Sequence, residues 1–595
     1  MSRRWHYLQE NHRSETIHSC IWYDCETTPE LLEDGTKRHN LEFGWAAYRR
    51  RLKGGAWSEP EWFRFVDWLE FWSWVVHHLR TGTCLYIWAH NQAFDLLASH
   101  AFEGLALLGG QMEDAIVDAP PLIIRYEFGR SKVVLVDTLN IWRMSLADMG
   151  EHTGLEKLDM PRQWTHSADD DIYCRRDVEV IMKAVTEWAD FLDAHDLGKF
   201  CLTIASQAMQ TFRHRYLDDS ILIDGHDEAL KIARACYHGG RVECFYIGPL
   251  KGPLYYLDIT SLYPAVMAAH RFPLRLRGVY HHVSPVELRH LLADYCVCAH
   301  VTLRTRSPFC PLVKDGKLLF PTGTFDADLS SPELEYALQH EDLVSIQACA
   351  VYEPGTPFVH FVQDLYQHKM LATRHGKVVE AGHWKLLLNS FSGKWGQSGI
   401  RWRTLRRARS NAIRFVRVFD RDTRELTLYR SFNGLVQVRE TSRESAHSHP
   451  AIAAHITAYG RMRLWALIGQ IAPEHRFYCD TDSILVSKDG LKQMKEPIQD
   501  EILGGLRLVG QFGDGHIYGC KDYVLDSVRT CKGIRDKAVE TNPGAYWQEK
   551  WVGFRGALAH GWLDGPRTMS VIKHLSRTYD KGVVLASGFV TPRHV

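Results

Sequence analysis

The chain lacks net charge, Cys-x-x-Cys pairs and long apolar runs, and each absence argues against a class of protein. Its 71 Lys and Arg residues equal its 71 Asp and Glu residues, so any affinity for a polyanion has to be local. Its 14 cysteines include no Cys-x-x-Cys pair, which argues against the common zinc modules. There is no signal peptide, internal repeat or apolar run of about 18 residues, so we expect a cytoplasmic protein without membrane contact.

Length and composition indicate several globular domains. The 595 residues exceed what one hydrophobic core organises, and 45% of them are hydrophobic, with 19 Trp. The functional signal therefore has to lie in short motifs.

Two apolar runs in the second half of the chain carry carboxylates. The first runs from Leu254 to Asp258 and predicts a buried strand. The second surrounds Asp480 and Asp482 and predicts two strands that meet at a polar tip; on a regular strand these two carboxylates would share a face. Carboxylates in apolar runs are costly unless a cation lies beside them. Two aspartates from separate strands can hold two Mg²⁺ ions that clamp the attacking and leaving oxygens of a phosphoryl transfer.

A helix is predicted between these two runs, at residues 385–394 (KLLLNSFSGK). Lys385 and Asn389 are four residues apart and share one face, which Ser392 continues. A lysine on that face can pair with triphosphate oxygens. Arg374 and Lys377, further upstream, are additional candidates for the same role.

In this order the three strings resemble motifs A, B and C of the family B DNA polymerases. Motif A is DITSLYP at 258–264 and motif C is YCDTDS at 478–483. The resemblance makes Asp258 and Asp482 the main metal ligands and Asp480 a supporting catalytic residue. It places Tyr263 under the sugar, where a 2′-OH would clash. The family has Tyr where this chain has Ser392, a departure that affects nucleotide selection rather than the chemistry.

A second group of carboxylates lies in the first 200 residues. Asp24 and Glu26 share one face of a strand-like run, Asp95 follows another apolar run, and Tyr173 and Asp177 are four apart on a helix-like segment. These strings resemble the Exo I, II and III motifs of the DnaQ-like 3′–5′ exonucleases. The resemblance implies a two-metal hydrolytic site held by the four carboxylates, in which Tyr173 orients the attacking water.

Further short matches resemble DNA-contacting elements of the same family. Asn91 and Phe94 would hold a frayed 3′ end, the ring by stacking. The remaining matches are a strand-end motif of protein-primed members, a YxGG string and a KxY string: Thr138 and Leu139; Tyr237, Gly239 and Gly240; Lys521 and Tyr523.

The spacing between the motifs indicates the branch of the family. Gaps of 127 positions between Asp258 and Lys385, and 86 between Lys394 and Asp480, leave room for two insertions, as in the protein-primed members. Residues 401–430 hold ten arginines against three acids and predict a basic hairpin that projects from the palm and contacts DNA phosphates.

The resemblance implies an α/β and α+β multidomain fold, in which an RNase H-like exonuclease domain precedes a right-hand polymerase. The expected boundaries are exonuclease 1–200 and polymerase 201–595, with palm about 235–275 and 450–530, insertion about 276–355, fingers about 360–400, basic hairpin insertion about 401–445 and thumb about 531–595.

The implied function is template-directed DNA synthesis with proofreading, by a monomer that replicates a viral, plasmid or mobile-element genome in the host cytoplasm. The implied cofactors are Mg²⁺ or Mn²⁺, two ions per active site. The partners are primer-template DNA, dNTPs and a terminal protein that serves as primer. Two alternatives stay open: a primer-independent or conventionally primed family B polymerase, and a non-catalytic DNA-binding replication protein.

Overall fold

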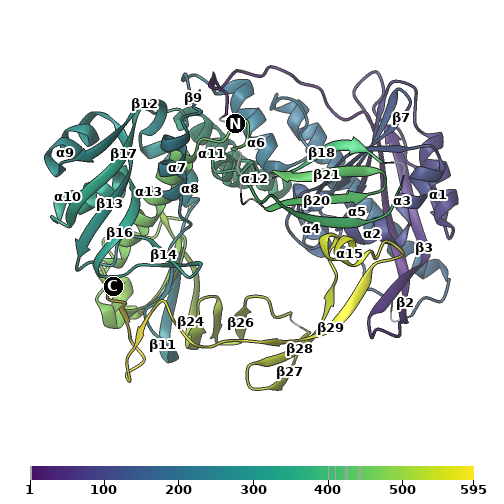
Figure 1. Ribbon diagram of the computed structural model, residues 1–595. Helices are drawn as coiled ribbons and strands as arrows, with labels where there is room; N and C mark the ends of the chain where they lie inside the picture. Colours follow the sequence, from purple (N-terminus) through teal and green to yellow (C-terminus); the bar gives the residue numbers. More distant parts are fainter. Residues whose placement is uncertain are drawn as a thin grey trace.

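The computed structural model describes residues 3–595 except 119, 162, 400, 409, 423, 425, 441–443 and 536. Its larger sheets have ten, seven, four and four strands and are arranged in an arch from the N-terminal to the palm region (Figure 1). In the described part of the chain, no helix is long and apolar enough to cross a membrane.

The N-terminal region is built on a mixed sheet. Strand β2 (Ser19–Leu31) pairs antiparallel with β3 (Lys37–Arg50) and parallel with β5 (Cys84–Ala89), which pairs parallel with β8 (Ser131–Asp137). Central residues of β2 are buried, as expected for a strand covered on both faces. Helix α5 (Ala168–Ala194) packs against this sheet. The sheet and α5 therefore place the carboxylates of β2 opposite those of the helix.

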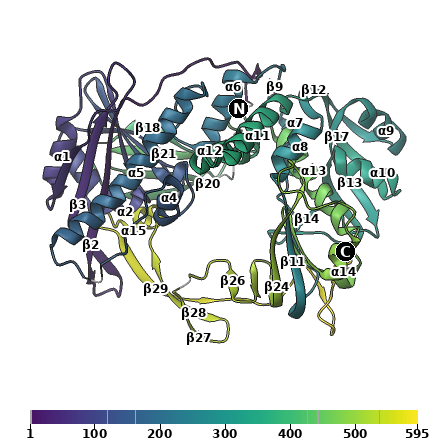
Figure 2. The ribbon, with the colours of Figure 1, turned by 180° about the vertical axis from the view of Figure 1, so that it is seen from behind.

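One hydrophobic core joins the N-terminal region to the helices of the polymerase region. Phe191 of α5 meets Trp384 of α12 (Val378–Trp395) with ring centroids 4.8 Å apart. Helix α12 packs antiparallel to α11 (Val359–Arg374) and also contacts α6 (Ile204–Arg215), as Figure 2 shows from behind. The two regions are thus packed together through aromatic side chains.

The palm region is a seven-stranded sheet in the order β10-β22-β23-β11-β24-β25-β26. At its centre lie β11 (Gly248–Ile259), β22 (Arg476–Asp480), β23 (Ser483–Ser487) and β24 (Leu506–Gly519). The predicted strand ending at Asp258 and the predicted hairpin at Asp480 are both confirmed. The segment after α8 (Leu262–Ala269) forms a separate four-stranded sheet: β12 (Phe272–Val283), β17 (Leu343–Gly355), β13 (Cys296–Thr305) and β16 (Gly323–Ser330).

The basic segment forms a four-stranded sheet rather than one hairpin. Its strands, in the order β18-β21-β20-β19, are β18 (Arg401–Arg407), β21 (Leu435–Glu440), β20 (Leu426–Phe432) and β19 (Arg414–Phe419). The predicted pairing of β19 with β20 is confirmed, while Arg409 and Glu425 of that prediction lie outside the described residues. The sheet does not project from the palm alone, because Phe432 and Leu435 are buried in the N-terminal core.

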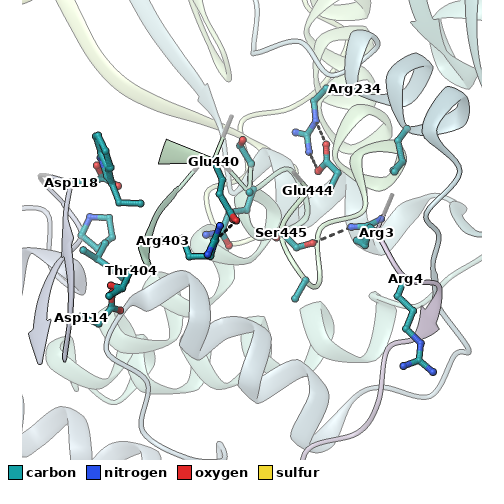
Figure 3. A pocket seen from close by; sticks show the side chains of 18 of the residues that line it. Arg3, Arg4, Asp114, Asp118, Arg234, Arg403, Thr404, Glu440, Glu444 and Ser445 are labelled. Atoms are coloured by element: carbon teal, nitrogen blue, oxygen red, sulfur yellow. Dashed lines mark hydrogen bonds and ion pairs between the residues drawn. The ribbon is translucent and has the colours of Figure 1, made fainter. Parts of the chain in front are cut away.

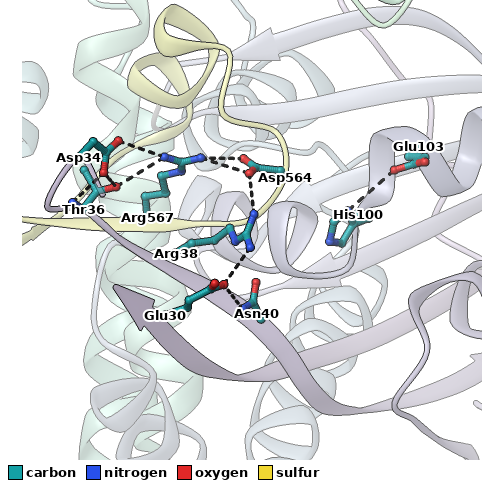
Figure 4. Close-up of polar contacts among 9 residues, drawn as sticks. All are labelled: Glu30, Asp34, Thr36, Arg38, Asn40, His100, Glu103, Asp564 and Arg567. Carbon is teal, nitrogen blue, oxygen red and sulfur yellow. Dashed lines mark hydrogen bonds and ion pairs between the residues drawn. The ribbon is translucent and has the colours of Figure 1, made fainter. Parts of the chain in front are cut away.

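The C-terminal segment joins the N-terminal sheet. Strand β28 (Ala545–Trp551) pairs with β29 (Arg567–His574), and β29 continues the sheet by pairing with β3 at Lys37 and Arg38. Helix α15 (Phe554–His560) buries Phe554 and Leu558 in the same core. Figure 4 shows the polar network that holds this junction, in which Arg567 and Arg38 both pair with Asp564.

The chain end returns to the insertion. The Val595 N–H donates to Thr322 O at 2.9 Å, and the Thr324 N–H donates to Val595 O at 3.0 Å. Residues 531–595, expected to form only a thumb, therefore contact both the N-terminal sheet and the insertion.

Candidate active sites

The palm sheet brings Asp258 and Asp482 together. Asp258 on β11 lies directly opposite Ser483, and the Ile259 N–H donates to Asp482 O at 2.7 Å. Burial and then the charge of Asp258 raise the pKa of Asp482 to about 6. Two carboxylates that disfavour each other's charge are suited to a divalent cation between them.

Asp480 points to a different partner. Its carboxylate pairs with Lys521 Nζ at 2.9 Å and accepts hydrogen bonds from Tyr478 Oη and Thr481 Oγ1, each at 3.1 Å. Asp480 and Asp482 do not share a strand face as expected, because a turn begins between them, with Thr481 left-handed at φ 58°. Lys521 of the KxY string therefore lies at the catalytic hairpin, and the ring of Tyr523 lies 5.3 Å from that of Tyr478.

The YxGG string, residues 237–240, packs against this turn. A Cβ on Gly240 would lie 2.7 Å from Thr481 Cγ2, and the Thr481 N–H donates to Arg241 O at 2.7 Å. The Gly239 carbonyl accepts from the buried guanidinium of Arg461 at 2.9 Å. Gly240 thus permits close approach to the catalytic turn, whereas the sequence suggested close approach to a phosphate. Tyr237 packs beside Gly396 at the end of α12.

Cations of α11, α12 and β24 lie near one another, and Arg507 of β24 pairs with Asp258. Lys385 and Asn389 are exposed on one face of α12. The pKa of Lys369, on α11, is lowered by burial and by the charges of Lys385 and Arg507, so these three side chains are neighbours. The sequence motifs did not identify Lys369 or Arg507. Tyr263 packs on the backbone of Gly460.

Two residues predicted to bind triphosphate form ion pairs with glutamates instead. Arg374 pairs with Glu501 at 2.9 Å, and Lys377 pairs with Glu380 at 3.0 Å. Both cations are exposed, and their contact with nucleotide stays a prediction.

Ser392 is half-exposed on α12, and its aromatic neighbours pack into the core. Phe391 and Trp395 are fully buried, with Phe391 against Phe212 at a centroid distance of 4.9 Å. We expect Ser392→Tyr to lower the apparent KM for the correct dNTP severalfold, since stacking on a ring contributes about 1–3 kcal/mol. Steady-state kinetics with one correct and one incorrect dNTP measure the effect, and Ser392→Ala is the matched control. A raised KM for the correct dNTP would refute the interpretation.

The N-terminal region holds the second group of carboxylates. Among the described residues, the ligand atoms of Asp24, Glu26 and Cys174 lie within 4.8 Å of one another. Burial and the charge of Asp177 raise the pKa of Asp24 to about 8, and burial and the charge of Asp24 raise that of Glu26 to about 9. Burial also raises the pKa of the Cys174 thiol, so it stays protonated and is a poor ligand.

Helix α5 completes this site with Tyr173 and Asp177. Lys157 forms an ion pair with Asp177 Oδ2 and donates to Tyr173 Oη at 2.9 Å. The other oxygen of Asp177 is buried and has no hydrogen-bond partner. A buried carboxylate oxygen without a hydrogen-bond partner, next to Asp24 and Glu26 with their raised pKa values, is consistent with a binding site for a divalent cation. Lys157 was not predicted, because it lies in an irregular segment that carries no motif.

The remaining predicted residues surround this site. Asp95 is buried and accepts from the Cys25 N–H at 3.0 Å, so its carboxylate faces β2. Phe94 is half-buried and meets Trp551 of β28 edge to face at 5.1 Å, so the C-terminal segment reaches the site.

The residues at the strand ends have clear structural roles. Asn91 adopts the left-handed conformation, and its N–H donates to Asp137 at 3.0 Å. Thr138 is fully buried and donates to Ala89 O at 3.3 Å, whereas Leu139 is half-exposed. Contact of these side chains with DNA stays a prediction.

A cavity of about 1390 Å³ lies between β6 (Gln111–Val117), β18 and α7 (Asp227–Ala235) (Figure 3). Its wall carries charges of both signs, and two arginines are already paired, Arg403 with Glu440 and Arg234 with Glu444. The balanced charges give no preference for an anion, and neither carboxylate group lines the cavity.

Comparison with known proteins shows similarity to DNA polymerases. A family model described as DNA polymerase type B, organellar and viral, matches residues 155–405. A DNA polymerase of Kluyveromyces lactis is 23% identical over 383 residues, covering 59% of this chain and 37% of the relative, so the chain spans little more than a third of that relative. A DNA-directed DNA polymerase of Enterobacteria phage PRD1 is 22% identical over 545 residues, covering 89% of this chain and 87% of the relative.

Solved structures share the fold. Phi29 DNA polymerase complexed with primer-template DNA and incoming nucleotide matches with a TM-score of 0.64 and 16% identity, over 94% of this chain and all of that one. Its complex with single-stranded DNA matches with a TM-score of 0.63 and 17% identity, over 88% and 93% of the two chains. The predicted fold class is confirmed.

Residues 155–405 of the chain are thus similar to the type B DNA polymerases. The chain is similar to the phage enzymes of PRD1 and phi29.

Proposed function

We propose that the chain is a template-directed DNA polymerase with a 3′–5′ proofreading exonuclease. The observation that carries the proposal is the juxtaposition of Asp258 and Asp482 at one end of the palm sheet, with the cation of Arg507 paired to Asp258. Phosphoryl transfer needs positioning and charge neutralisation, and this arrangement supplies both. Extension of a labelled primer on a DNA template tests it.

Each polymerase residue has a role that follows from its place. Asp258 and Asp482 would hold Mg²⁺ or Mn²⁺, which polarises the phosphate and lowers the pKa of the primer hydroxyl. Lys385, with Lys369, would bind triphosphate oxygens, and Tyr263 would exclude a 2′-OH. Lys521 would hold Asp480 at the edge of the site and contact a primer phosphate.

The N-terminal carboxylates would form the exonuclease site. Asp24, Glu26, Asp95 and Asp177 are proposed as the ligands of its divalent ions, and the Asp177 oxygen without a partner supports this assignment. Tyr173, fixed by Lys157, would orient the attacking water.

Protein priming is the favoured mode of initiation. The similarity to the PRD1 polymerase over 89% of the chain and the two insertions support a terminal protein as primer. The assay compares nucleotide addition to an oligonucleotide primer with addition to a hydroxyl of a purified terminal protein. Synthesis that requires only the oligonucleotide favours conventional priming.

The exposed strand β19 is proposed to contact DNA. All its residues are exposed, and it presents Arg414 and Arg417. We expect Arg414→Gln/Arg417→Gln to shorten the products of one binding event and to reduce the salt slope of DNA binding by about 2, because each lost phosphate contact contributes about 1. Extension under a DNA trap across a salt series measures this, with Lys488→Gln/Lys495→Gln as the control of equal charge. Unchanged product lengths would contradict the proposed contact of β19 with DNA.

A further inference from the structure

Arg507, which lies outside all of the polymerase motifs, forms an ion pair with Asp258. It lies on β24, directly opposite Asp258 on β11, and its Nη2 lies 2.6 Å from Asp258 Oδ2. The arginine side chain is 46% exposed and that of Asp258 is 20% exposed. An ion pair with a half-exposed guanidinium is only weakly stabilising, so another cation can displace the arginine from Asp258.

Arg507 is also one of three neighbouring cations. Burial lowers the pKa of Lys369 most, and the charges of Lys385 and then of Arg507 lower it further. In the described part of the chain, no ion pair joins Lys369 or Lys385 to a carboxylate, whereas Arg507 is paired with Asp258. Three neighbouring positive charges repel one another unless a polyanion lies between them. A nucleoside triphosphate is such a polyanion.

We propose that Arg507 exchanges between two anions during the reaction cycle: it neutralises Asp258 in the free enzyme and moves to the triphosphate when nucleotide and divalent ions arrive. This inference rests on the proposed polymerase function. An arginine keeps its charge at any working pH, so it has to be displaced by another cation rather than by loss of a proton. A divalent ion on Asp258 and Asp482 displaces it, and the planar fork then fits phosphate oxygens bidentately.

The exchange has two opposite consequences for binding. Arg507 competes with the divalent ion for Asp258, so it weakens metal binding in the absence of nucleotide. It adds a charge-assisted hydrogen bond to the triphosphate, so it strengthens nucleotide binding. A residue that only supports the sheet has neither effect, which makes the pair of effects diagnostic. Arg507 is therefore a positioning residue in the free enzyme and a ligand of substrate in the complex.

The first test measures metal binding without catalysis. Mn²⁺ binding is followed by the loss of the free-ion electron paramagnetic resonance signal, in the Asp24→Ala/Glu26→Ala background that removes the second carboxylate site. Arg507→Gln should bind Mn²⁺ about threefold to fivefold more tightly than that background without nucleotide, as expected for loss of a partly exposed ion pair. Arg507→Lys should lie between the two. Unchanged or weaker Mn²⁺ binding by Arg507→Gln overturns the proposal.

The second test separates KM from kcat in primer extension. Arg507→Gln should raise the dNTP KM about tenfold, the loss expected for one charged hydrogen bond, and change kcat much less. A fall in kcat with unchanged KM overturns the proposal. Arg463→Gln is the matched control, since it removes an arginine–carboxylate pair of the palm with similar exposure, to Glu496. If the parent adds no nucleotide at all, the polymerase function fails, and the Mn²⁺ titration still decides whether Arg507 competes for Asp258.

Discussion

Asp482→Asn should abolish nucleotide addition while 3′–5′ degradation of single-stranded DNA continues at the parent rate. Asp482 and Asp258 lie side by side on the palm hairpin and β11, and burial, followed by the charge of Asp258, raises the pKa of Asp482. An amide removes the charge that holds the ion while keeping the size of the side chain. We expect a loss of more than about 10³-fold, because a bound metal stabilises transition-state charge by several kcal/mol.

Asp480→Asn is the matched comparison, on the same turn. The Asp480 carboxylate already pairs with Lys521 Nζ at 2.9 Å. Removing the charge of Asp480 should therefore reduce extension far less than removing the charge of Asp482. Primer extension and digestion of a labelled single strand are measured on the same preparations, and circular dichroism checks the fold. Loss of both activities by a folded Asp482→Asn protein would count against separate sites.

Asp24→Ala/Glu26→Ala should remove the exonuclease and raise misincorporation, with extension retained. Both carboxylates lie on β2 in the N-terminal sheet and have no contact with the palm hairpin among the described residues. Removing two ligands leaves Asp177 and Asp95 without the partners needed to hold a pair of ions. Trimming of a mismatched 3′ end measures the effect, and trimming at the parent rate would mean that the assignment is wrong.

The same variant has a signature in stability. In the metal-free parent, the pKa values of about 8 for Asp24 and about 9 for Glu26 mean that the folded state keeps protons that the unfolded chain releases above about pH 4. Stability in EDTA should therefore fall as the pH rises from about 4 to about 9, because the folded state binds more protons. The double variant should lack this component of the pH dependence, as thermal unfolding across that range would measure.

Local patterns were sufficient to predict the strands and the helix that carry the candidate polymerase residues. The strand ending at Asp258, the hairpin at Asp480 and the helix carrying Lys385 are each encoded by a few adjacent residues. Burial of alternating or continuous apolar residues determines such elements without distant contacts. The family resemblance then supplied the pairing of Asp258 with Asp482, which lie more than 200 positions apart.

Residues that act through distant contacts were not predictable in this way. Lys157, Lys369 and Arg507 are ordinary basic residues in sequence, and only the fold brings them to carboxylates or to one another. Arg461 is buried against Glu333 and holds the Gly239 carbonyl, a role with no local pattern. The pairing of β29 with β3 joins positions separated by more than 500 residues, for which one sequence alone gives no signal.

The pairing of β29 with β3 also bears on how such a chain can evolve by recombination. A crossover near residue 200 would transfer the N-terminal carboxylates without the C-terminal segment. Strand β3 would then have an unpaired edge at Lys37 and Arg38. The N-terminal core would also lack the apolar side chains of Phe554 and Leu558. A viable exchange would have to carry the segment from β28 to β29 as well, although more than 500 residues separate β29 from β3 along the chain. The two ends of this chain are therefore expected to be inherited together, and an exonuclease borrowed from a relative would need its own C-terminal strands.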